Sequence, residues 1–181
     1  VRSIQLFFDV QNVDLHYSDD WPDLMKASGR VLVDNQFTQV ETTEAFVKDE
    51  SVDSLVVTWL GDERKELNVD VRSQVSTQLG LYFLNNTWLQ SKVGETFSSW
   101  SGEGNIHVNV NVDIPLFETA KNSGIEPKQQ VQISFSDNVF HLPDQRLDFS
   151  NVSGDLYFSN SKGLHSDNLS LILFGNKLPL R

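Results

Sequence analysis

The chain has 181 residues, of which 39% are hydrophobic, and its acidic residues outnumber the basic ones by 25 to 14. The hydrophobic residues suffice for one sizeable core, and the chain is too short for two ordinary domains, so we expect one folded unit. The net charge of -11 argues against nucleic acid and against attachment to an anionic lipid surface, because both need clustered Lys and Arg.

Two absences narrow the class further. Cysteine is missing, which excludes disulfides and thiolate metal sites. No stretch of 18 apolar residues occurs, and there is neither an initiating Met nor a signal peptide. We therefore expect no membrane-spanning segment in this sequence and interpret it as a piece of a longer protein.

Alternation with a period of two residues dominates the chain and predicts strands with one dry and one wet face. The first segment runs from Ile4 and shifts phase at Gln11–Asn12, as at a bulge or a tight turn. The clearest segment is Ile106–Ile114, where every even position is aliphatic and every odd one polar. Weaker alternation marks 31–33, 55–59, 67–71, 131–135, 156–158 and 169–173.

Short turn signals separate these segments. They lie at Ser28–Gly29, Leu60–Asp62, Lys162–Gly163 and Phe174–Asn176. About ten strands with short connections favour antiparallel neighbours.

One segment, from Gln78 to Trp100, departs from this pattern. Apolar residues recur there near helical spacing, at Leu81, Leu84, Trp88, Phe97 and Trp100. Because Asn85–Thr87 offers turn chemistry and Gly94 weakens the second piece, we predict two short helices whose apolar face packs on the sheet.

The chain nearly repeats itself about 125 residues apart. Phe8–Tyr17 and Gly29–Asn35 return as Phe135–Asp144 and Gly154–Asn160. We therefore interpret residues 1–181 as one segment, made of one repeat unit of about 125 residues and the start of the next from about residue 131. Neighbouring repeats of the same chain are then its expected partners.

This repeat bears on how the sheet covers its apolar face. About twenty residues of predicted helix cannot cover about ten strands, so the sheet either closes as a sandwich or barrel, or stays open as a long curved antiparallel trough. Alternation alone favours the closed form. The repeat favours the open form, since an open sheet can be lengthened by adding units.

Several segments, in their order and spacing, resemble repeats of the YhdP family, the large AsmA-like proteins of the Gram-negative envelope. They are Asp20–Leu24, Val112–Leu116, Leu147–Phe158, Gly163–Leu169 and Phe174–Arg181. The resemblance implies a β-groove (AsmA-like) in the periplasm, in a parent protein anchored in the inner membrane, that assists phospholipid transport to the outer membrane. Phospholipid acyl chains are then the implied partner.

The sequence offers no strong signal for chemistry. The histidines, His16, His107, His141 and His165, lack metal-ligand spacing, and no G-x-S-x-G elbow or calcium loop is present. Gly102–Asn105 lacks the pattern of a phosphate loop and is interpreted as a turn. We therefore expect no catalytic residues, no metal and no cofactor, and a protein that is not an enzyme.

Two hypotheses remain. In the first, the chain is a lipid conduit whose dry faces line a groove collectively, through Ile106, Val108, Val110, Val112, Ile114, Val131, Ile133, Phe135, Leu156, Phe158, Leu169, Leu171 and Leu173. In the second, it is a closed β-sandwich that serves as a structural or partner-binding module of the envelope, and the same residues form an ordinary core. The shape of the sheet discriminates between them.

Overall fold

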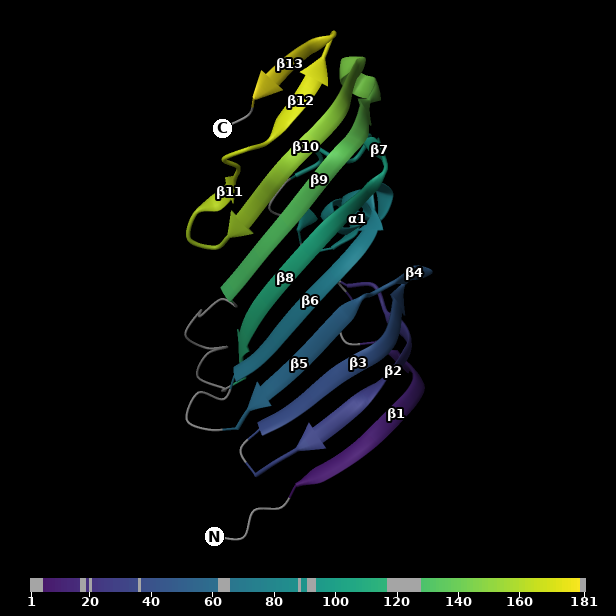
Figure 1. Ribbon diagram of the computed structural model, residues 1–181, viewed down its shortest axis with the longest axis vertical. Helices are drawn as coiled ribbons and strands as arrows, with labels where there is room; N and C mark the ends of the chain where they lie inside the picture. Colours follow the sequence, from purple (N-terminus) through teal and green to yellow (C-terminus); the bar gives the residue numbers. More distant parts are fainter. Residues whose placement is uncertain are drawn as a thin grey trace.

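A computed structural model describes residues 5–16, 19, 21–35, 37–61, 66–87, 89–90, 94–116 and 128–179. These residues form one antiparallel sheet of 13 strands, one α-helix and a short 3-10 turn (Figure 1). The strands are β1 (Leu6–Leu15), β2 (Leu24–Val33), β3 (Phe37–Val47), β4 (Glu50–Ser51), β5 (Ser54–Leu60), β6 (Glu66–Ser76), β7 (Ser101–Glu103), β8 (Asn105–Pro115), β9 (Lys128–Leu142), β10 (Leu147–Ser159), β11 (Gly163–His165), β12 (Ser170–Leu173) and β13 (Asn176–Pro179). The helix α1 is Thr77–Asn86, and the 3-10 turn η1 is Pro143–Gln145.

The sheet is open. Its strands follow the order β1-β2-β3-β5-β6-β8-β9-β10-β12-β13, with β4, β7 and β11 paired at the side of this path. The first and last strands, β1 and β13, are the two edge strands and lie far apart in Figure 1. The long open antiparallel sheet is thus confirmed, and the closed sandwich is wrong.

The strand register places apolar side chains of successive strands on one side of the sheet. Residues directly opposite each other on paired strands point to the same side. One such row runs across six strands through Phe8, Val31, Val40, Val57, Val69 and Val112. The alternate row on the other side runs through Asp9, Arg30, Glu41, Val56, Asp70 and Asn111. We call these two sides the apolar face and the polar face.

The helix α1 lies on the apolar face at one end of the strands. Its N-cap is Ser76, whose hydroxyl accepts a hydrogen bond from the Leu79 backbone N–H at 3.0 Å, and the Glu50 carboxylate accepts from the Ser76 backbone N–H at 2.6 Å. A Cβ added at Gly80 would lie 2.7 Å from the Ile106 side chain, so the helix rests directly on β8. We call this the capped end of the sheet and the opposite one, where β1 begins and β8 ends, the open end.

The first of the two predicted helices is α1, and the second falls partly on residues 91–93, which lie outside the described residues. Gln90 is helical, and its backbone oxygen accepts a hydrogen bond from the Gly94 N–H at 2.8 Å; residues 94–99 form turns, with Gly94 in the left-handed region at a φ of 65°. Leu81 is buried as predicted, and Trp88 lies outside the described residues.

The two repeated hairpins correspond at an offset of 125 residues, which aligns Val10 with Phe135, so the predicted match of Phe8 with Phe135 is wrong by two residues. The pairs Val10 with Gly29 and Val13 with Ala27 in β1–β2 match Phe135 with Gly154 and Asn138 with Val152 in β9–β10. Both hairpins are bulged at this place, as predicted for the first one. In both, a residue with positive φ, Asn12 or Asp137, donates its backbone N–H to the hydroxyl of Ser28 or Ser153.

The predicted turn at Ser28–Gly29 is wrong, since both residues lie within β2. The glycine is there because β3 approaches closely. A Cβ at Gly29 would lie 2.4 Å from the Glu41 backbone oxygen.

Candidate functional site

The apolar face is the feature of this fold that could contact another molecule over a large area. On β8, Val108, Val110, Val112 and Ile114 are half-buried, although they belong to the central part of the sheet. In an ordinary core such central aliphatic residues would be fully covered. A partly covered apolar face of this extent is typical of a surface with a partner.

The register places twelve of the thirteen predicted site residues on this face, and the thirteenth, Leu169, lies directly before β12. Half-buried ones are Val108, Val110, Val112, Ile114, Val131, Ile133, Phe135, Leu156, Phe158, Leu169 and Leu173, whereas Ile106 and Leu171 are 3% and 5% exposed. Ile106 is covered by α1 and therefore contributes to the support of the helix. The structure does not bring these residues into a compact pocket; they are spread over β8, β9, β10, β12 and the residue before β12.

The polar face is held by hydrogen bonds between side chains of neighbouring strands. Asn68 donates its amide N–H to the Asp113 carboxylate at 2.7 Å, and Ser134 donates its hydroxyl to Asp155 at 2.5 Å. Asn168 also donates to Asp155, at 2.7 Å. The hydrogen bonds from Ser134, Asn168 and Gln132 lower the pKa of Asp155. This face is thus suited to contact with water, in contrast to its counterpart.

Two apolar clusters close the capped end. The first contains Leu24, Ala27, Ala45 and Val47, each at most 9% exposed, with Phe83 of α1 packed against them. The second is aromatic: the Trp100 ring lies 4.8 Å from Phe97, 6.1 Å from Phe140 and 6.2 Å from Phe149, measured between centroids. Here the apolar face is shielded from water.

The open end is different, because large apolar side chains remain exposed there. Leu6 is 55% exposed, Trp59 38%, Leu116 48% and Leu164 58%. Trp59 is opposite Leu67 and Leu164 is opposite Phe158, so both belong to the apolar face. The apolar face is therefore covered at the capped end and accessible at the open end.

Two histidine–carboxylate pairs occupy equivalent places in the repeated hairpins. His16 Nδ1 lies 2.7 Å from Asp23, and His141 Nδ1 lies 2.8 Å from Asp148. The carboxylates of Asp23 and Asp148, together with Asp19 and Glu103 at the other ring nitrogens, accept hydrogen bonds from the rings and raise the pKa of both imidazoles. Both pairs are exposed and join the two strands of a hairpin. Sequence reasoning missed them, although a His and an Asp seven residues apart recur in the two copies.

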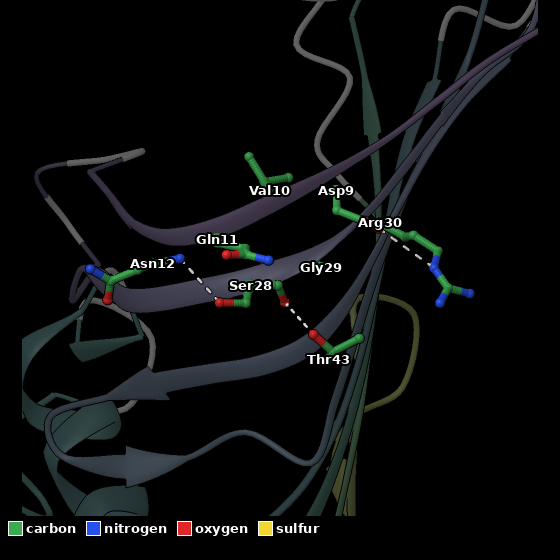
Figure 2. A pocket seen from close by; sticks show the side chains of 8 residues that line it. All are labelled: Asp9, Val10, Gln11, Asn12, Ser28, Gly29, Arg30 and Thr43. Atoms are coloured by element: carbon green, nitrogen blue, oxygen red, sulfur yellow. Dashed lines mark hydrogen bonds and ion pairs between the residues drawn. The ribbon is translucent and has the colours of Figure 1, made fainter.

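A shallow pocket of about 430 Å³ lies beside the bulge of β1 and β2 (Figure 2). Thr43 donates its hydroxyl to the Ser28 backbone oxygen at 3.2 Å, and Arg30 forms an exposed ion pair with Asp9 at 3.7 Å. These contacts connect strands to each other. Among the eight residues that line the pocket, no nucleophilic side chain lies next to a general base, so the pocket has no arrangement for covalent catalysis.

Metal chemistry finds no support in the part of the chain that the structure describes. No group of three or more His, Cys, Asp or Glu side chains there is arranged to hold a metal ion. His107 is exposed on the polar face, and the His165 ring stacks on Tyr157 at 5.6 Å between centroids. The described residues also contain no helix with the length and apolar character that crossing a membrane requires.

The chain is similar to a known family of proteins. The family model described as YhdP protein matches residues 2–181. No curated protein and no solved structure matches the chain.

Proposed function

Because the chain belongs to the YhdP family, we propose that it is a non-enzymatic segment of a lipid conduit in the cell envelope. In this proposal the parent protein is anchored in the inner membrane, and its sheet extends through the periplasm. Phospholipid acyl chains travel along the apolar face toward the outer membrane, while the polar face meets water.

The observation that carries the proposal is the unbroken apolar row from Phe8 on β1 to Val112 on β8, on a sheet that does not close. Each methylene group of an acyl chain that leaves water for such a surface gains about 0.8 kcal/mol, without directional contacts. On such a surface the binding free energy summed over the whole acyl chain is large, whereas the contribution of any single contact is small. That combination suits movement along the face.

The correspondence of the two hairpins supports a further part of the proposal, that the chain is one unit of a repeating array. If residues 1–181 are one unit of about 125 residues and the start of the next, then β1 takes in the parent protein the kind of neighbour that β9 has here. That neighbour is β8, which pairs with β9 along eight residues, from Ile106 opposite Phe135 to Asp113 opposite Lys128. The apolar face would then continue from one unit to the next.

The test replaces Val110, which is opposite Val71 and Val131 on the apolar face, with Asp. Because Val110 is half-buried and water reaches this face, we expect a folded protein with a modest loss of stability. Lipid capture should fall sharply, since a carboxylate opposes contact with acyl chains. The measurements are thermal unfolding of the fragment and photocrosslinking of phospholipid from a photoreactive residue at position 110 of the full-length protein.

The matched control is Asn109→Asp, one residue away on the polar face, which should change neither measurement. Failure of the photoreactive residue at 110 to capture any lipid, together with unfolding of the Val110→Asp variant, would refute the conduit.

A further inference from the structure

The uncovered part of the apolar face has a defined depth along the strands. On β8 it extends from Ile114 at the open end to Val108, beyond which Ile106 is covered by α1. Six residue steps of a strand span about 20 Å. The hydrocarbon of one bilayer leaflet is about 15 Å thick, half of the ~30 Å core. The depth of the uncovered face, about 20 Å, is therefore enough for one layer of lipid tails and too short for the ~30 Å of two layers.

The two ends of this depth differ in the groups they could accept. At the capped end, Leu81 of α1 is 3% exposed and Ser73 of β6 is 7% exposed, so a polar headgroup there would lose its water without gaining a partner. At the open end, Trp59 and Leu164 are exposed on the apolar face. A headgroup at this end keeps contact with water.

On the basis of the proposed function, we propose that a phospholipid binds with its two acyl chains parallel to the strands, its headgroup at the open end and the methyl ends of its chains at α1. The helix is then the floor of the lipid layer and sets how long a chain the face accepts. Successive lipids lie side by side across the strands and move along the sheet without turning.

The alternative orientation places the chains across the strands, along the row from Phe8 to Val112. In that case the headgroup of each lipid lies above aliphatic side chains over the middle of the sheet. The parallel orientation avoids this loss of hydration, because every headgroup is at the open end.

The absence of cysteine allows the orientation to be measured directly with single-cysteine variants. Ile114→Cys and Val108→Cys place a fluorophore at the two ends of the uncovered depth on one strand, and Asn109→Cys places it on the polar face as a control. The labelled chain is incubated with vesicles of phosphatidylethanolamine and phosphatidylglycerol that contain spin-labelled phosphatidylcholine. The nitroxide is near either the carbonyl end or the methyl end of an acyl chain, and fluorescence is read on protein separated from the vesicles.

We expect the ratio of quenching by the carbonyl-end label to quenching by the methyl-end label to exceed one at position 114 and to fall below one at position 108. Equal ratios at both positions, or the reverse order, overturn the parallel orientation while leaving the conduit intact. Quenching that is absent at both positions, or as strong at 109 as at 108, overturns the proposed function as well. Circular dichroism spectra identical to that of the unmodified chain confirm that each variant is folded.

Discussion

Asn138 joins the capped end of the sheet to α1, and its replacement tests how that end is held. The side chain is fully buried. Its amide N–H groups donate to the Thr77 hydroxyl at 2.8 Å and to the Asn105 backbone oxygen at 2.9 Å, while its oxygen accepts from the Ser136 backbone N–H at 2.8 Å. Thr77 is the first residue of α1, so this one amide connects β9, β8 and the helix.

The expected loss in the free energy of unfolding follows from the polar groups that lose their hydrogen-bond partners. In Asn138→Ala, the buried Thr77 hydroxyl loses a donor, and the Asn105 oxygen and the Ser136 N–H lose partners in part-buried hydrogen bonds, so we expect a total loss of about 1–3 kcal/mol. In Asn138→Asp, a nearly isosteric change, an acceptor replaces the amide donor and adds a buried charge, which costs about 3–5 kcal/mol. Urea unfolding followed by circular dichroism measures both losses.

The Asp variant also has a distinctive pH dependence. Protonation restores a donor on its carboxyl group, so the stability difference between Asn138→Asp and Asn138→Ala should change in favour of the Asp variant as the pH falls. An Asn138→Asp protein within about 0.5 kcal/mol of the original at neutral pH, the range of ordinary surface substitutions, would refute this account of the site.

Further predictions concern the histidine pair, the glycine of β2 and the helical segment. The pKa of His141 is raised by Asp148, so the stabilisation is complete below the unfolded pKa of about 6.5 and is lost as the pH rises through the higher folded value. His141→Gln should thus flatten the decline of the unfolding temperature as the pH rises above about 6.5. If the decline is unchanged in this variant, groups other than His141 cause it. Gly29→Ala should cost about 1–3 kcal/mol in urea unfolding, because its Cβ meets the Glu41 oxygen, and a neutral effect would mean that β3 shifts freely. Deleting residues 78–100 removes α1 and should leave an aggregating chain by light scattering, whereas a soluble variant with native-like unfolding would show that the capped end closes without it.

The alternation along the chain determined which segments are strands and which side chains share a face. This works for Ile106–Ile114 because a strand turns its side chains to opposite sides at every residue, whatever it is paired with. The bulge near Asn12 could also be predicted from the sequence, because a bulge shifts the alternation of apolar and polar residues at the place where it occurs. The resemblance to the YhdP family, carried by the order of short segments, was confirmed over nearly the whole chain.

The sequence was misleading where a residue serves a neighbour that is distant along the chain. Gly29 resembled a turn residue, yet it lies in mid-strand because the Glu41 backbone comes close to it. The aromatic cluster of Phe97, Trp100, Phe140 and Phe149 shows no common period, since its members come from a turn segment and two strands.

Only the tertiary structure decided whether the apolar face is sealed, and at which end. Alternation is the same in a closed sandwich and in an open sheet, because it depends on the strand alone. Closure depends on whether the two edge strands, here β1 and β13, pair with each other. Their separation, and the position of α1 over Ile106, result from the register of every strand pair between them and are encoded in no single segment.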